Sequence, residues 1–320
     1  MIYDLSYYIN GIKNKDRIVL SKAITLVEST VVEHRKLANE LIDFCFKTNK
    51  KAKRIGITGS PGVGKSTFIN ALGNEILDQN KTLAVLAIDP SSSISKGSIL
   101  GDKTRMYEIA HDKNVYIRPT ASGNNLGGIA QHTFETILLC ETFGFDYILV
   151  ETVGVGQSEI EIKHLTDIFL LLILPNSGDE LQGIKRGVME LADIIIINKA
   201  DKNNVQQAKI SAAQLKSVLP LLNYNNNDWN NLVLQASSTE NTGIQNVFKQ
   251  IENYFSKVDV DTIRKQQLMN WKNNLIQNII KQKINSNEKI QQLIKQYLSN
   301  DGFSHQYLEN ISDEIDRLMS

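Results

Sequence analysis

A short glycine-rich stretch, Gly59 to Ser66, has the spacing of a phosphate-binding loop. It reads GSPGVGKS, which fits GxxxxGK[ST], and it lies between an apolar run and a helical pattern. Glycines let the backbone curl so that N–H groups point at phosphate oxygens, and the following helix N-terminus adds partial positive charge. The predicted phosphate-binding residues are Gly59, Ser60, Pro61, Gly62, Val63, Gly64, Lys65, Ser66 and Thr67. Lys65 is expected to reach the β- and γ-phosphates, Ser66 to bind Mg²⁺ and Thr67 to contact the α-phosphate.

A second motif predicts which base the nucleotide carries. Residues 198–201 read NKAD at the end of an apolar run. The Asp201 carboxylate can accept hydrogen bonds from N1–H and the N2 amino group of guanine, whereas adenine would leave it unpaired. Lys199 can lie along the base plane, and Asn198 can join neighbouring loops. A later loop, Ser237, Ser238 and Thr239, is expected to bring a backbone N–H to guanine O6, so the sequence predicts GTP rather than ATP.

Acidic residues follow other apolar runs, where they can hold a metal ion or sense the γ-phosphate. Asp89 ends the run at 83–89, and Glu151 ends the run at 147–151. Carboxylates at these places suit Mg²⁺, which prefers oxygen ligands. Glu151 begins an ExxG pattern in which the Gly154 N–H is predicted to bond the γ-phosphate. Gln157 is a candidate for positioning the attacking water, with an ordinary loop residue as the alternative.

The elements that must position these residues alternate between short apolar runs and helical patterns. The runs lie at 54–58, 83–89, 115–119, 147–151, 168–175, 194–199 and 232–236. Helical patterns lie near 65–78, 129–143, 182–192, 204–219 and 244–256. Continuous apolar runs are typical of strands buried on both faces of a parallel sheet. We therefore predict an α/β, doubly wound, mostly parallel sheet, with the ligand beyond the carboxyl ends of its strands.

The two ends of the chain are predicted to be helical. We expect a helical extension over 1–50, a nucleotide-binding domain over 51–258 and a helical region over 259–320. Apolar stripes at 268–284 and 290–298 must be buried, either on the core or against another subunit. The polar run at 223–231 is expected to be a surface loop without a role.

Composition excludes several classes of protein. The 320 residues contain 35 Lys plus Arg and 35 Asp plus Glu, which argues against nucleic-acid binding through bulk charge. Two distant cysteines, Cys45 and Cys140, exclude a disulfide scaffold. The longest aliphatic run, Ile168 to Pro175, is shorter than the roughly 20 residues that span a bilayer. With no basic stretch followed by an apolar one near Met1, the expected compartment is the cytoplasm, and no membrane partner is predicted.

The motifs together resemble the MeaB/ArgK-type GTPases, a branch of the P-loop proteins that includes the human methylmalonic aciduria type A protein. The matching stretches are GSPGVGKSTFINALG, AIDPSSS, GSILGDKTRM, NLGGIAQHTFETILLCETFGFDYILVETVGVGQSE, FLLLILP, GDELQGIKRGVMELAD and NKAD, with KAITLVES before them. The sequence departs from this family where Asn176-Ser177 replaces a glycine-containing stretch. In the loop from 237 to 244, Ser238 replaces alanine and Asn241 stands where glycine is frequent.

The resemblance implies a function and roles for particular residues. Family members are chaperones that use GTP to gate adenosylcobalamin loading and to protect or reactivate an acyl-CoA mutase, chiefly methylmalonyl-CoA mutase. It implies that Lys65, Asp102 and Glu151 are catalytic, and that Ser66, Asp89, Asp102 and Glu151 form the Mg²⁺ site. It also implies a mutase-responsive switch at 178–186, with Asp179 and Lys185, and a homodimer formed by the C-terminal helices. Hydrolysis is expected to be slow and stimulated by the partner.

Two other functions are weighed against this one. A metal-delivery GTPase needs a His or Cys cluster, and the five histidines are scattered with no HxH or CxxC. A kinase of a transport system needs a general base beside an acceptor pocket, which no pattern supplies. The cobalamin-binding pattern DxHxxG is absent, so cobalamin is expected on a partner rather than on this chain.

Overall fold

A computed structural model describes residues 3–48, 50–89, 106–121, 126–152, 158–175, 186–222, 229–288, 290–292 and 295. Its helices are α1 (Leu5–Lys13), α2 (Arg17–Val27), α3 (Val32–Thr48), α4 (Lys65–Asp78), α6 (Tyr107–Ala110), α7 (Leu126–Phe143), α8 (Ser158–Lys163), α10 (Arg186–Leu191), η1 (Lys202–Asn204), α11 (Val205–Leu222), α12 (Ile244–Lys257) and α13 (Val260–Ser286). Its strands are β1 (Lys53–Gly59), β2 (Leu83–Asp89), β3 (Val115–Ala121), β4 (Tyr147–Thr152), β5 (Ile168–Ile173), β6 (Ile194–Ile197) and β7 (Leu232–Gln235).

The described strands form one seven-stranded sheet in the order β3-β2-β4-β1-β5-β6-β7, with every pair parallel. The chain builds one half of the sheet from β1 towards β3 and the other half from β5 towards β7. Strand order therefore reverses beside β1, which is where ligands bind in such sheets. The predicted doubly wound α/β fold is confirmed.

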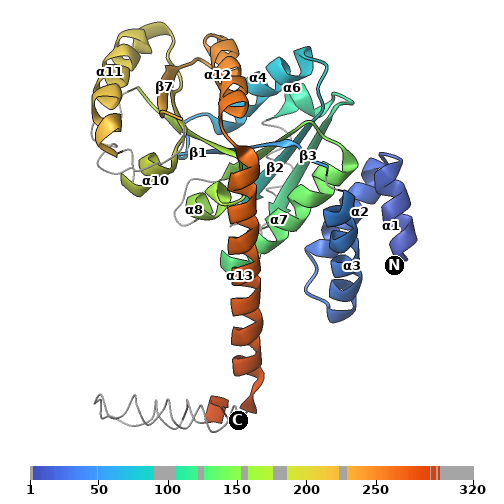
Figure 1. The fold of residues 1–320 in the computed structure, drawn as a ribbon. Coiled ribbons are helices and arrows are strands. Elements are labelled where there is room, and N and C mark those ends of the chain that lie inside the picture. Colours follow the sequence, from blue (N-terminus) through green and yellow to red (C-terminus); the bar gives the residue numbers. More distant parts are fainter. Residues whose placement is uncertain are drawn as a thin grey trace, which may run out of the picture. The chain divides into compact units, whose positions relative to one another are not determined.

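Helices cover both faces of the sheet because alternate strand residues point to opposite sides. On one face, Ile55 and Ile57 of β1 pack with apolar residues of α4, α6 and α12. On the other face, Leu171 and Ile173 of β5 pack with α10 and α11. Figure 1 shows α4, α6 and α12 on one side of the strands and α7, α8 and α10 on the other. All four residues of β6 are buried, as a strand covered on both faces requires.

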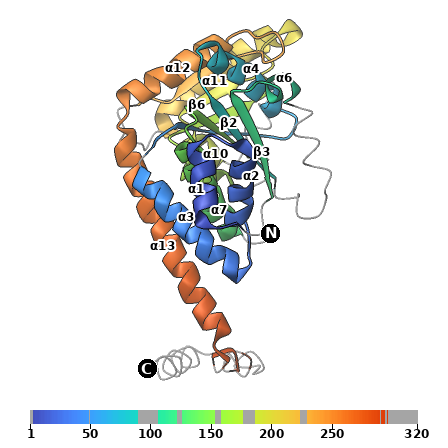
Figure 2. The ribbon, with the colours of Figure 1, turned by 90° about the vertical axis from the view of Figure 1, so that its right-hand side faces the viewer.

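The N-terminal helices add a layer outside α7. Figure 2 shows α1, α2 and α3 packed beside α7, in agreement with their contacts. The Asp16 carboxylate accepts from the backbone N–H groups of Ile18 and Val19, which caps α2. Arg35 of α3 donates two hydrogen bonds to the buried Glu135 of α7, at 3.1 and 2.8 Å.

Most predicted elements begin and end within a few residues of the observed ones, and α4 and β2 coincide with their predicted ranges. The helix expected near 182–192 is described only as α10, because 182–185 lie outside the described residues. The expectation that 223–231 is a surface loop is wrong for Trp229, which is 7% exposed. Its Nε1–H donates to the Asp193 carbonyl at 3.1 Å, and its ring meets Tyr254 edge to face.

The chain divides into two compact units, residues 1–264 and residues 265–320. The first contains the sheet and its helices together with the first turn of α13. The second contains the rest of α13, on which Met269, Ile276, Ile279 and Ile280 are exposed. No helix among the described residues is long and apolar enough to cross a membrane.

Candidate functional site

The predicted phosphate-binding loop joins the carboxyl end of β1 to the start of α4. Gly59, Gly62 and Gly64 all have positive φ. At Gly64 φ is 96°, and a Cβ atom would lie 2.9 Å from the Asn198 side-chain nitrogen, so both conformation and space require glycine there. Lys65 is 9% exposed, and its ammonium group donates to the carbonyls of Gly59 and Ser60 at 2.8 and 3.3 Å. The loop thus wraps around one buried cation at a helix N-terminus, which suits a phosphate chain.

Two of the predicted metal-binding side chains meet beside this loop. The Ser66 hydroxyl donates to the Glu151 carboxylate at 3.4 Å. Glu151 pairs in register with Ile57 of β1 and Ala87 of β2, so the carboxyl ends of these three strands converge. Asp89 ends β2 at the same edge of the sheet. A hydroxyl and a carboxylate this close are suitable ligands for Mg²⁺, a cation that prefers oxygen.

Asn198 and Lys199 connect the predicted base-binding loop to the phosphate-binding loop. The Asn198 amide donates to the Val63 carbonyl at 2.9 Å and accepts from the Ser238 hydroxyl at 2.8 Å. The Lys199 ammonium donates to the Gly62 carbonyl at 2.8 Å. Ser238, where the resembled family has alanine, thus supplies Asn198 with a hydroxyl donor that alanine would lack. These bonds hold three loops from distant parts of the sequence in one arrangement.

The loop that follows β7 donates hydrogen bonds to the Asp201 carboxylate. The hydroxyls of Ser237 and Thr239 both donate to one of its oxygens, Thr239 at 3.2 Å. The Ala200 N–H donates to the Ala236 carbonyl at 3.0 Å, which aligns the two loops. Because two donors restrict its rotation, the carboxylate is preorganised to accept two parallel hydrogen bonds, as guanine would supply.

Asn241 shows why its loop tolerates the loss of a glycine. Its φ is 52°, in the left-handed region that glycine adopts most readily. Asparagine enters this region at lower cost than most residues, so the turn keeps its conformation. The turn is closed by two backbone hydrogen bonds between Ser237 and Thr242, at 2.9 and 3.1 Å.

Several predicted site residues cannot be placed. The list is Asp102, Arg105, Gly154, Gln157, Asp179, Lys185 and the side chain of Asp89, all outside the described residues. The remaining predicted residues lie together at the carboxyl edge of the sheet, around β1, β4 and β6.

Sequence patterns did not predict the hydrogen bonds from two hydroxyls to Asp201 or the burial of Glu161. Glu161 lies on α8, directly after the ExxG segment, and burial raises its pKa to about 7. Its Oε2 atom is buried and has no hydrogen-bond partner among the residues that the structure describes. A glutamate on a short helix resembles many surface residues, so only the fold reveals that this one is desolvated.

Comparison with known proteins identifies the family. Residues 20–289 match the family described as methylmalonyl Co-A mutase-associated GTPase MeaB. The GTPase ArgK of Escherichia coli is 40% identical over 271 residues, which cover 83% of this chain and 82% of that protein. The mitochondrial methylmalonic aciduria type A homolog of Mus musculus is 39% identical over 298 residues, covering 89% and 72%.

A solved structure has a similar fold. The crystal structure of a protein titled LAO/AO transport system kinase has a TM-score of 0.81 and 31% sequence identity, and the match covers 99% of both chains. The match to the MeaB description spans both the phosphate-binding loop and the NKAD loop, and the relatives include proteins named as GTPases. The chain therefore belongs to the MeaB family of P-loop GTPases.

Proposed function

We propose that this GTPase is a chaperone of an adenosylcobalamin-dependent acyl-CoA mutase, with methylmalonyl-CoA mutase as the leading candidate. Membership of a family described as mutase-associated is the observation that carries the proposal. GTP binding and hydrolysis would gate cofactor loading and protect or reactivate the mutase. In this proposal the mutase, and not this chain, binds cobalamin. The proposed compartment is the cytoplasm.

The site supports the nucleotide part of this proposal. Lys65 neutralises phosphate charge inside the loop, while Asp201, held by Ser237 and Thr239, selects guanine. Mg²⁺, held by Ser66, Asp89, Asp102 and Glu151, would stabilise the charge that develops on the phosphates. Lys65, Asp102 and Glu151 are the proposed catalytic residues, and Gly154 bonds the γ-phosphate.

We expect hydrolysis to be slow in the isolated chain, because the mutase would complete the catalytic machinery. No glutamine of the kind that positions the attacking water in Ras-like GTPases is identified in the sequence, apart from the candidate Gln157. The segment 178–186 is the proposed switch that answers to the mutase, and the exposed face of α13 is the proposed homodimer contact.

A direct test measures GTP hydrolysis with and without a cobalamin-dependent mutase. We expect phosphate release to rise by about tenfold or more, since a catalytic contact supplied by a partner can contribute roughly 10³–10⁵-fold. Lys65→Ala, which removes the buried ammonium, should show little activity in either condition and so controls for contaminating GTPases. Unchanged hydrolysis of the parent across methylmalonyl-CoA mutase and several related mutases would remove the partner assignment, while the GTPase assignment would stand.

The metal-delivery alternative has little to support it. Across the part of the chain that the structure describes, no group of three or more His, Cys, Asp or Glu side chains is arranged to hold a metal ion. The proposed Mg²⁺ set differs, because it includes the Ser66 hydroxyl and relies on side chains outside those residues.

A further inference from the structure

A second pocket lies at the opposite edge of the sheet from the phosphate-binding loop. It has a volume of about 790 Å³ and is lined at the amino ends of the strands by Lys53, which begins β1, and Tyr147, which begins β4. Since β1 ends at Gly59 and spans seven residues, roughly 20 Å separates this pocket from the nucleotide loop. GTP bound at the phosphate-binding loop would not reach it.

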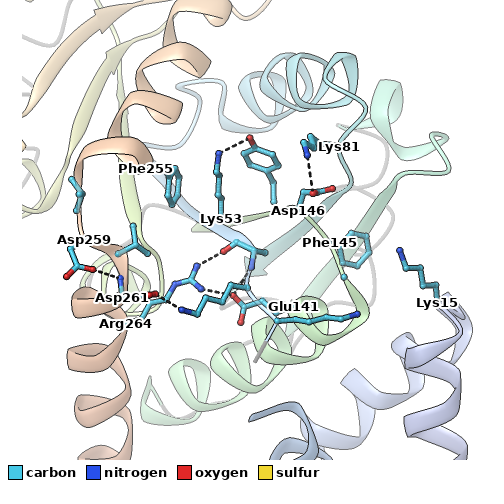
Figure 3. A pocket seen from close by; sticks show the side chains of 17 residues that line it. Lys15, Lys53, Lys81, Glu141, Phe145, Asp146, Phe255, Asp259, Asp261 and Arg264 are labelled. Carbon is cyan, nitrogen blue, oxygen red and sulfur yellow. Dashed lines mark hydrogen bonds and ion pairs between the residues drawn. The ribbon is translucent and has the colours of Figure 1, made fainter. Parts of the chain in front are cut away.

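The pocket brings together five segments that are distant in sequence, and all lie in the first compact unit. They are the α1–α2 turn, the link from α3 to β1, the link from α4 to β2, the α7–β4 turn and the link from α12 into α13. Figure 3 shows Lys15 extending towards Phe145 at one end of the pocket, with Arg264 and Asp261 at the other. Its volume falls within the range of small-molecule sites.

Positive charge exceeds negative charge in this lining, although the whole chain has a formal net charge of zero. The cations are Lys15, Lys50, Lys51, Lys53, Lys81 and Arg264, and the carboxylates are Glu141, Asp146, Asp259 and Asp261.

Most of these cations are already neutralised by carboxylates. Lys51 pairs with Asp261, Lys53 with Glu252 and Lys81 with Asp146. Arg264 pairs with Asp167 and Glu141. Among the described residues, only Lys15 and Lys50 of the lining cations have no carboxylate within ion-pair distance.

These two unpaired cations converge on one point. A Cβ atom built on Gly144 would lie 3.7 Å from the Lys50 ammonium nitrogen and 3.9 Å from that of Lys15. Gly144 has φ of 105°, so a side chain there would be strained, and both ammonium groups lie at ordinary contact distance from the position such a side chain would take. Lys15 itself adopts φ of 57°, a conformation uncommon for lysine, in the turn that directs it here.

Two ammonium groups this close to the same position repel each other, and an anion bound between them would relieve that repulsion. Lysine binds phosphate as a point charge, and two lysines suit a group that carries more than one negative charge. Phe255 and Val258, which are partly buried in the same lining, offer apolar surface for an organic part of the ligand. We propose that Lys15 and Lys50 form a second anion site over Gly144, which binds a small molecule carrying a di- or polyphosphate group.

The test titrates pyrophosphate into the full chain already saturated with GDP, so that the phosphate-binding loop is occupied. Isothermal titration calorimetry of the parent should show one saturable site. The variant Lys15→Gln/Lys50→Gln should bind pyrophosphate at least about tenfold more weakly, because each lost charge removes a charge-assisted contact. Repeating the titration with ADP distinguishes an inorganic from an organic ligand, since ADP should bind more tightly if the apolar surface contributes.

A matched control changes two exposed lysines of α11, Lys209→Gln/Lys216→Gln, which removes the same charge away from the pocket. The control should bind pyrophosphate like the parent, and all three proteins should bind GDP equally. The absence of pyrophosphate binding to the GDP-loaded parent, or equal weakening in both variants, would overturn the proposal. If all three proteins still bind GDP, a negative pyrophosphate result contradicts only the second anion site and leaves the proposed function untouched.

Discussion

At the level of single residues, the candidate nucleotide site contains a few side chains that hydrogen bonds from neighbouring loops hold in one orientation. Asp201 is held by two hydroxyls, and Asn198 bridges Val63 and Ser238. Fixed groups cost little reorganisation when a ligand binds, so each contact contributes more to selectivity than it would on a flexible loop.

Asp201→Asn should change which nucleotide binds. The new amide N–H₂ would face the N1–H and N2 donors of guanine, so we expect GTP affinity to fall by about two orders of magnitude. Xanthosine triphosphate has a carbonyl at the second carbon of its base, and the variant should prefer it. Competition binding with both nucleotides measures the change. Asp78→Asn, an exposed aspartate at the end of α4, should behave as the parent does. Equal GTP affinity in parent and Asp201→Asn would contradict the base-site argument.

At the level of elements, ion pairs to buried carboxylates of α7 join this helix to α3 on one side and to β1 on the other. Arg35 of α3 holds Glu135 of α7, whose side chain is 3% exposed, and it also donates to the Val27 carbonyl at the end of α2. Arg54 of β1 holds the buried Glu141 of α7 through two hydrogen bonds, at 2.9 and 2.7 Å. Removing one member of such a pair leaves a buried charge without a partner, which costs more than the pair itself contributes.

Glu135→Gln should destabilise the protein in a pH-dependent way. Burial alone would raise the pKa of Glu135, but contacts with His132 and Arg35 outweigh it and hold the pKa below the ordinary value of 4.5. A carboxyl whose pKa is lower in the folded state contributes stability above its unfolded pKa, and that contribution is lost as pH falls through the folded pKa.

The expected loss in the free energy of unfolding is about 2 kcal/mol at pH 7. The difference between parent and variant should shrink as pH falls below 4.5, as urea unfolding at several pH values would show. Glu40→Gln, an exposed change on α3, provides the control. A parent–variant gap that does not depend on pH would argue against an ionised Glu135 in this pair.

At the level of the whole molecule, α13 carries an apolar stripe that is exposed among the residues the structure describes. Met269, Ile276 and Ile280 recur at helical spacing and are 65%, 55% and 43% exposed. A second copy of the chain would bury this face in the proposed homodimer, because repeated exposed isoleucines on one helix are costly in water.

Ile276→Glu/Ile280→Glu should therefore produce a monomer. Two charges placed in an apolar interface disfavour association, whereas the nucleotide site lies in the other compact unit. Analytical ultracentrifugation should show a dimer for the parent and a monomer for the variant, with GDP affinity unchanged. Ile210→Glu/Val218→Glu, which alters two exposed apolar residues of α11, should remain dimeric. A monomeric parent would refute the dimer proposal.

Local spacing in the sequence is enough to predict the chemistry of the phosphate-binding and base-binding loops. The GxxxxGK[ST] loop, the NKAD motif and the buried strands are patterns of neighbouring residues, because loop curvature, helix starts and strand burial are set within a few positions. These patterns were sufficient to predict the α/β fold and the edge of the sheet where the nucleotide is proposed to bind, and the resemblance of longer stretches indicated the family.

Contacts between residues far apart in sequence become known only from the fold. The fold sets the strand order and buries Trp229. It also brings hydroxyl donors to Asp201, and it brings Lys15 and Lys50 together beside Gly144. No local periodicity encodes such contacts, since they arise when helices and strands pack to bury their apolar faces. A lysine in a turn and another beside a strand look like ordinary surface residues until the fold brings both to the same glycine.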